Sequence, residues 1–251
     1  TTTNCSGLGS GSEGGVAIDW ANLSQMQQCL LNDDPTTAAF DNDNRGDERV
    51  DYLRGDTSEE GTNTGDFRVR SGGFKLGDIV NSTPAYVGAP VALPDSLETT
   101  THSSFSGGIT GRREMLYVGA NDGMLHGFAA SGTTTEQGQE KLAFVPSQVY
   151  ENLNKLTDPN YRNTHQFYVD GSPTVGDAFG AFDGTYAGKN TGCGTSCWRT
   201  VLAGGLAGGG KGIFALDVTD PDGSFISSIG FSEANAANIV LNTYLAEAGI
   251  E

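Results

Sequence analysis

The apolar positions of this chain come in short runs that are broken by turns, rather than in the long stripes of helical proteins. Two segments, FRVRSGGFKLGDIVNSTPAYVG (67–88) and YVDGSPTVG (168–176), share one order: an apolar run, a polar turn, Ser-Pro or Thr-Pro, and a new apolar run. Within them, Val80-Asn81-Ser82-Thr83-Pro84 matches Val169-Asp170-Gly171-Ser172-Pro173. Such self-similarity indicates a repeated structural unit.

A second pair of apolar runs repeats in the same way. MLYVG (115–119) resembles TVLAG (200–204), and each is followed by a Gly turn and another run, at 124–128 and 213–217. Strand–Gly turn–strand units of this size are typical of β-propeller blades. The spacing exceeds that of one usual blade, so each copy spans either one blade with insertions or two blades. We therefore predict an all-β fold that is a partial or incomplete β-propeller.

A short helix is predicted before the first blade, at 19–31. Ser24 and Gln27 have the spacing of a capping box, which marks the start of a helix. The apolar positions that fall on one face of this helix are Trp20, Leu23, Met26 and Leu30.

The remaining pattern sets the expected organisation of the chain. A further strand is predicted at 142–149, and the tail loses the strand pattern and predicts a helix at 234–248. We expect a polar N-terminal segment with a short helix and an acidic loop (1–66), the blades (67–226) and a divergent tail (227–251).

Composition agrees with a fold of short strands and many turns, because hydrophobic residues make up 36% of the chain and 37 of its 251 residues are Gly. No apolar run approaches the roughly 20 residues needed to span a bilayer. No signal peptide is visible and the chain starts without Met, so we expect a mature or internal fragment.

The chain is strongly acidic, with 31 acidic against 14 basic residues and a net charge of −17. Nucleic acid is an unfavourable partner for such a chain, because phosphate binding needs clustered Lys and Arg. The acid excess suits either calcium binding or solubility in salt.

Four cysteines allow three disulfide pairings. The nearest partners are Cys5 with Cys29, and Cys193 with Cys197, and we predict these two disulfides and hence an oxidising, exported setting. Four free thiols remain the alternative. A zinc site is less favoured, because the Cys-x-x-x-Cys segment lacks a second pair of ligands nearby.

The most polar stretch of the chain, residues 33–56, is a candidate calcium loop, because calcium prefers several hard oxygen ligands and a Gly at a sharp turn, here Gly46. The match to an EF-hand loop is partial, since its fifth position is Arg45 and its twelfth is Tyr52. A solvated acidic loop is the equal alternative. The candidate ligands are Asp41, Asp43, Asn44, Asp47 and Asp51.

Two Arg-Gly-Asp tripeptides occur, at 45–47 and 54–56. An exposed tripeptide of this kind can dock into a receptor whose metal ion takes the Asp carboxylate. The alternative for Arg54-Gly55-Asp56 is structural, with Gly permitting a tight turn between locally paired charges.

Catalytic signatures are weak. The Gly-rich run at 205–212 lacks the final Ser or Thr of a phosphate-binding loop, and a strand is expected after it rather than a helix. His102, His126 and His165 lie in separate segments without the spacing of a catalytic pair. We therefore expect no catalytic residues and no enzyme activity.

Six segments, taken in order along the chain, closely resemble the PilY family of type IV pilus biogenesis and tip-adhesin proteins. The resemblance covers about residues 18–225. The segments are RVDYLRGD (49–56), 67–88, MLYVGANDGMLHGF (115–128), AFVPSQVYENLNKLTDPNY (143–161), YVDGSPTVGDAF (168–179) and WRTVLAGGLAGGGKGIFALDVTDP (198–221).

This resemblance implies a C-terminal β-propeller domain exposed at the pilus tip, cell surface or outer membrane. Such proteins act with minor pilins in pilus assembly and support adhesion and motility, and some bind calcium through an acidic loop or a host receptor through Arg-Gly-Asp. Carried over here, the calcium loop is the acidic set above and the receptor tripeptide is Arg54, Gly55 and Asp56. One departure is Phe128-Ala129-Ala130, where the family motif ends Phe-Asp-Ala.

The blade pattern is also similar to that of quinoprotein dehydrogenases, which hold a quinone cofactor (PQQ) and a metal ion in a propeller. A fragment of such an enzyme is the alternative function. It is disfavoured because the chain has only two Trp and no adjacent Cys pair.

Overall fold

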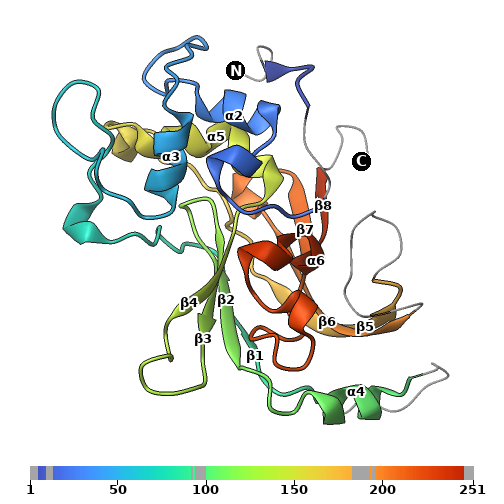
Figure 1. The fold of residues 1–251 in the computed structure, drawn as a ribbon. Coiled ribbons are helices and arrows are strands. Elements are labelled where there is room, and N and C mark those ends of the chain that lie inside the picture. The colour runs from blue at the N-terminus through green and yellow to red at the C-terminus, as the bar shows by residue number, and fades with distance from the viewer. Residues whose placement is uncertain are drawn as a thin grey trace.

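The predicted strands form two four-stranded antiparallel sheets (Figure 1). The computed structural model describes residues 5–9, 14–91, 93, 100–182, 193 and 196–245. The first sheet contains, in order, β1 (Ala85–Val87), β2 (Met115–Gly119), β3 (Leu125–Ala129) and β4 (Glu140–Phe144). The second contains β5 (Thr174–Gly180), β6 (Cys197–Gly205), β7 (Gly212–Asp217) and β8 (Val240–Leu245). The partial propeller is thus confirmed, with each copy forming one blade.

Helices in the described residues are short. The α-helices are α2 (Gln25–Leu31), α3 (Gly46–Leu53), α4 (His102–Gly108), α5 (Tyr150–Leu153) and α6 (Ala236–Ile239). α2 and α3 precede the first sheet, α5 follows it, and α4 and α6 lie in connections between strands of one sheet (Figure 1). The 3-10 turns are η1 (Trp20–Asn22), η2 (Ser71–Gly73), η3 (Ser147–Val149), η4 (Asn154–Thr157), η5 (Tyr161–Asn163), η6 (Ala207–Gly209), η7 (Ser227–Ile229) and η8 (Glu233–Asn235). None of the helices in the described part of the chain has the length and apolar character to cross a membrane.

The helix predicted at 19–31 begins later in the structure, because Trp20–Asn22 form the separate 3-10 turn η1 and α2 begins at Gln25, directly after the predicted capping residue Ser24. The Ser24 hydroxyl accepts from the backbone N–H of Gln27, and the Gln27 side chain accepts from the Ser24 N–H, which completes the capping box. Leu23 and Leu30 are buried in the main hydrophobic core, and Trp20 and Met26 pack against it.

The register of the two hairpins agrees with the alignment of the copies. Gly119 at the end of β2 faces Leu125, and in the second sheet Gly204 faces Phe214, the residue that the alignment of 124–128 with 213–217 makes equivalent to Leu125.

Equivalent residues of the two copies contact each other directly. Asn81 donates from Nδ2 to Oδ2 of Asp170 (2.7 Å), a residue 89 positions later. Ser82 donates to the carbonyl of Gly171 (3.1 Å), and the Thr83 N–H donates to the Ser172 hydroxyl (2.9 Å). The repeated segments therefore lie side by side, each residue next to its counterpart.

A buried arginine joins the two sheets behind this contact. Arg112 donates to the carbonyl of Gly88 (2.8 Å), the Thr200 hydroxyl (2.6 Å) and the carbonyl of Thr219 (3.3 Å). Burial lowers the pKa of Arg112, and nearby carboxylates, chiefly those of Asp177 and Asp217, act against that shift.

Two predicted elements differ in the structure. The tail forms only η8 and α6 before β8, which pairs with β7, so the blade region extends beyond residue 226 and the helix predicted at 234–248 was wrong. Residues 67–80 contain no described strand; Phe67 is buried and forms one bridge with Glu60, whereas Val80 is 54% exposed. Hydrophobicity alone predicted strands in a segment whose backbone has no neighbouring strand to pair with.

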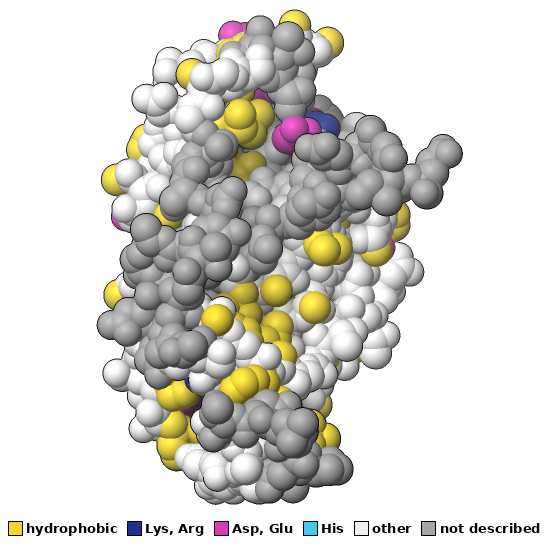
Figure 2. Space-filling model, turned by 90° about the vertical axis from the view of Figure 1, so that its right-hand side faces the viewer, with side chains coloured by type: hydrophobic (Ala, Val, Ile, Leu, Met, Phe, Trp, Pro, Cys, Tyr) yellow, Lys and Arg dark blue, Asp and Glu magenta, His cyan; other side chains and the backbone are white. Residues whose placement is uncertain are grey.

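One face of the molecule shows few charged side chains among its described atoms. In Figure 2 hydrophobic side chains are seen along the middle of this face. The acidic residues of 33–56 instead surround α3, where the candidate site lies.

Replacing Gly119 with Ala should test how closely the sheets approach. A Cβ on Gly119 would lie 2.2 Å from the carbonyl oxygen of Val169, whereas one on Gly176 in β5 would meet nothing within 4 Å. We expect Gly119→Ala to lower the free energy of unfolding by about 2–4 kcal/mol, and Gly176→Ala to change it by less than about 1 kcal/mol. Urea unfolding of both variants measures this, and equal stabilities would contradict the close packing.

His126 should make stability depend on pH. This β3 histidine is buried between Asp122 and Glu140. Burial acts to lower its pKa, but hydrogen bonds and charge from the two carboxylates raise it to about 9. Because the pKa of the unfolded chain is about 6.5, the contribution is complete below that pH and is lost as pH rises through about 9.

We expect a loss of about 3 kcal/mol in unfolding free energy over this window. The His126→Gln variant should show a flatter profile in urea unfolding at several pH values. An unchanged slope in the variant would exclude His126 as the cause.

Candidate functional site

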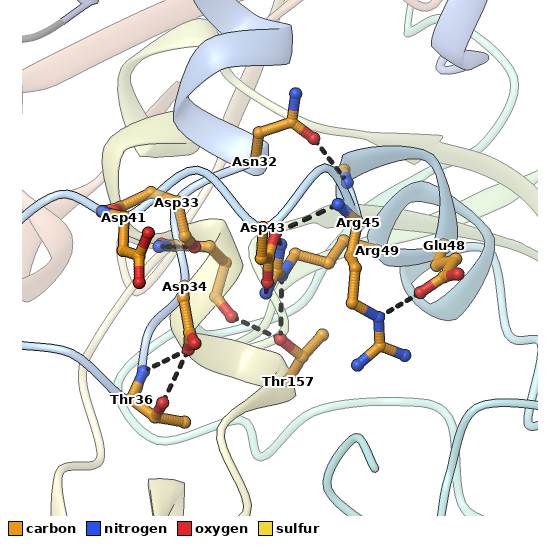
Figure 3. A network of polar contacts seen from close by, with 12 residues as sticks. Asn32, Asp33, Asp34, Thr36, Asp41, Asp43, Arg45, Glu48, Arg49 and Thr157 are labelled. Atoms are coloured by element: carbon orange, nitrogen blue, oxygen red, sulfur yellow. Dashed lines mark hydrogen bonds and ion pairs between the residues drawn. The ribbon is translucent and has the colours of Figure 1, made fainter. Parts of the chain in front are cut away.

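The acidic segment before α3 is folded by its own side chains (Figure 3). The Asp33 carboxylate accepts from the backbone N–H of Asp41 (3.0 Å), and Asp34 accepts from the N–H (2.8 Å) and hydroxyl (2.7 Å) of Thr36. The Asn32 side chain accepts from the N–H of Gly46 (2.8 Å), where α3 begins. These bonds hold the segment against the start of the helix.

Asp43 and the buried Arg49 form the central ion pair of this segment. The guanidinium donates from two nitrogens to the two carboxylate oxygens of Asp43, at 2.8 and 2.5 Å. It also donates to the carbonyl of Leu31 (2.8 Å) and the hydroxyl of Thr157 (3.3 Å). Burial acts to raise the pKa of Asp43, but the hydrogen bond and charge of Arg49 outweigh it and lower the pKa.

The five candidate calcium ligands are not brought together. Asp47 and Asp51 are exposed on α3, not in a loop, and Asp41 is exposed. The N–H of Asn44 donates to the Asn42 side chain (2.9 Å), and both oxygens of Asp43 are bonded to Arg49.

Within the described residues, no group of three or more His, Cys, Asp or Glu side chains is placed to hold a metal ion. A guanidinium already neutralises the carboxylate at the centre of the segment, so these residues do not fit a calcium site in this arrangement. Calcium binding itself stays a prediction.

The Arg-Gly-Asp tripeptide at 54–56 forms the turn after α3. Gly55 has a φ of +106°, which favours glycine, and the N–H of Asp56 donates to the carbonyl of Asp51 (2.9 Å). Arg54 is 43% exposed and donates to Glu233 (2.7 Å) and to the carbonyl of Ile18 (3.0 Å).

Asp56 is exposed at the end of this turn. Its carboxylate accepts from the N–H of Ser58 (2.6 Å), and hydrogen bonds from Ser58 lower its pKa, so it is charged at neutral pH. The backbone is held as well, because Arg70 donates to the Asp56 carbonyl. The turn therefore presents a charged carboxylate on a fixed backbone.

The first tripeptide, Arg45-Gly46-Asp47, is arranged differently. Arg45 pairs with Glu48 and Glu59, and Gly46 is buried, with a Cβ at that position predicted to lie 2.5 Å from the Trp20 ring. Only Asp47 is exposed, on the first turn of α3. This tripeptide has a packing role.

Cys5 is bonded to Cys29 and Cys193 to Cys197, the pairing expected from the sequence. The histidines lie in three separate places. His102 pairs with Asp177, His126 with Asp122 and Glu140, and His165 with Asp78. Both ring nitrogens of His102 and of His126 are engaged, which leaves neither free to act as a base.

Comparison with known proteins identifies relatives of this chain. The family model described as the PilY1 beta-propeller domain matches residues 76–239. The type IV pilus biogenesis factor PilY1 of Pseudomonas aeruginosa (strain PAK) is 46% identical over 218 residues, which cover 85% of this chain and 17% of that protein. A PilY1 homolog of Xylella fastidiosa (strain Temecula1 / ATCC 700964) is 44% identical over 178 residues, 69% of this chain and 13% of the homolog.

The chain therefore spans about a sixth of the length of the curated relatives it matches. Among solved structures, the crystal structure of the Pseudomonas aeruginosa PilY1 C-terminal domain matches with 37% identity and a TM-score of 0.32. The match covers 55% of this chain and 23% of that one.

Calorimetric titration with calcium should decide whether residues 41–51 hold the ion. Because Arg49 already occupies the carboxylate of Asp43, we expect the same heat from the unsubstituted chain and from the Asp41→Ala/Asp43→Ala variant. A heat that disappears in the double variant would instead establish calcium binding by this segment.

Proposed function

The chain belongs to the PilY1 β-propeller family, and from this membership we propose that it is part of a type IV pilus biogenesis factor that acts in pilus assembly. The observation that carries the proposal is the identity of 46% across 85% of the chain to a protein of that name. Because the chain spans only part of such proteins, the pilus role of the whole protein is an extension from its relatives.

The structure supports a binding role rather than catalysis. Two joined sheets form a rigid frame, and the loops around it carry the exposed polar groups, the usual division between scaffold and binding surface. Two disulfides suit an exported protein at the cell surface or pilus tip. The quinoprotein alternative is not favoured, since the relatives are pilus biogenesis factors.

The finer part of the proposal is adhesion through Arg54-Gly55-Asp56. The exposed, charged carboxylate of Asp56 suits a receptor that binds it with a metal ion, and the fixed backbone limits the entropy lost on binding. Contacts with minor pilins, support of motility and calcium dependence are proposed for the whole protein on the same family basis.

Pilus assembly should depend on the gene that encodes this chain. We expect deletion of the gene to lower the amount of sheared surface pilin several-fold, and the complete gene supplied in trans to restore it. The measurement is an immunoblot of sheared pili with total pilin as the control. Normal surface pilin in the deletion strain would overturn the pilus role.

Adhesion is tested separately by the conservative substitution Asp56→Glu, which keeps the charge but moves the carboxylate outward by one methylene. In a pilus-forming strain we expect attachment to host cells to fall about tenfold, equivalent to about 1.4 kcal/mol, with surface pilin unchanged. Asp47→Glu in the other tripeptide is the matched control and should attach normally. Equal attachment of both variants would rule out this tripeptide as the contact.

A further inference from the structure

A cleft of 210 Å³ lies beside the Arg-Gly-Asp turn. Tyr52 and Leu53 of α3 form one part of its wall, and the segment after the turn, which contains Arg68 and Lys75, forms another. The aliphatic carbons of Lys75 lie next to Gly55, about 3.9 Å from the place where a Cβ would be. The cleft and the proposed receptor turn therefore belong to one continuous surface.

Two cations on this cleft form no ion pair with a described residue, although the chain is strongly acidic. Of these, Lys75 acts on Asp56 through its charge alone, which adds to the hydrogen bonds that lower the pKa of that carboxyl. Six arginines of the described chain form ion pairs with carboxylates: 45, 49, 54, 70, 113 and 199. Arg68 forms none with a described residue. Its Nε donates to the carbonyl of Leu156 (2.8 Å), and its guanidinium carbon lies 4.8 Å from the centroid of the Tyr161 ring. Lys75 is exposed and is also without an ion pair among the described residues.

The acidic side chains that line the cleft form their contacts away from these two cations. Asp78 accepts from Asn121 and His165, and Asp122 pairs with His126. Among the described residues, Arg68 and Lys75 are therefore left without a carboxylate bonded to them.

Tyr52 lines the cleft but offers no contact to a ligand. It is 3% exposed, and its hydroxyl is closed off from the space that a ligand could fill. The group of the cleft that a ligand can reach is the guanidinium of Arg68, so the ligand that suits it is an acceptor with a negative charge.

The size of the cleft limits what can enter. Clefts for drug-sized ligands are larger, about 300–1,000 Å³, so 210 Å³ suits a single side chain. Apolar walls, including Phe74 (77% exposed) and Leu156, favour a carboxylate that is carried on methylene groups.

We propose that this cleft binds one acidic side chain, Glu or Asp, of a polypeptide partner. Arg68 bonds its carboxylate, and Lys75 adds charge at the rim. A guanidinium presents paired N–H groups that match the two oxygens of a carboxylate. The inference rests on the proposed function at one point, because it takes the partner of the Arg-Gly-Asp turn to be a polypeptide. That partner would place an acidic side chain in the cleft and a cation at Asp56.

The test uses two capped amino acids that differ only in charge, N-acetyl-glutamate amide and N-acetyl-glutamine amide. Each is titrated into the ¹⁵N-labelled chain, and the chemical shifts of the cleft amides and of Arg68 Nε–H are followed by NMR. We expect the glutamate probe to bind about tenfold more tightly, as a charged hydrogen bond would give. Equal binding of the two probes, or no shift with either, would overturn the proposal.

Two pairs of variants assign the effect to the cleft. Arg68→Gln should abolish the preference for glutamate, whereas Arg162→Gln, an exposed arginine outside the cleft lining, should keep it. Because Arg68 also bonds Leu156, Lys75→Gln serves as the variant that leaves the fold intact. It should weaken glutamate binding about two- to threefold, with Lys211→Gln as its control. A preference that persists in both cleft variants would contradict the assignment.

The probe measurement needs only the isolated chain. A loss of the pilus role in the genetic experiment would therefore leave a carboxylate site in place, and a failed titration would leave the pilus role untouched.

Discussion

The structure depends on polar contacts buried between its two sheets. Arg112 reaches from the first copy to Thr200 and Thr219 of the second, among carboxylates that include Asp217. Burial raises the pKa of Asp217, and the N–H of Thr219 and the charge of Arg199 oppose that shift. Charges buried this deeply are tolerated only where partners surround them, so the two sheets are held in one relative position.

The N-terminal segment is fixed to this frame through the turn η4. Asn154 donates to the carbonyl of Asp33 (2.9 Å), Arg49 donates to the hydroxyl of Thr157, and the backbone N–H of Arg68 donates to the carbonyl of Thr157 (2.9 Å). A few residues of the first copy thus position the acidic segment, α3 and the turn that follows it. The sequence of the candidate site does not share the repeat of the blades, yet the site is attached to the same scaffold.

Sequence patterns predicted the features that local chemistry determines. The repeat, the capping box at Ser24 and the nearest-neighbour disulfides follow from short-range signals and agree with the structure. Features that depend on distant partners were missed. The motif at 41–51 could not show that Arg49 would bond Asp43. The helical periodicity of the tail could not show that β8 would pair with the free edge of β7. The sequence gives one indication of the cleft that contains Arg68 and Lys75, because basic residues lie close together there in an acidic chain.

The contact between Asn81 and Asp170 has a consequence for the history of the repeat. These two residues occupy the same place in their copies, so a duplication that preserved the sequence would set either two carboxylates or two amides against each other. Two carboxylates at 2.7 Å would repel, whereas an amide and a carboxylate form a charge-assisted hydrogen bond. Two asparagines could still form a hydrogen bond. An amide in at least one copy is therefore what allows identical positions of the repeat to lie against each other.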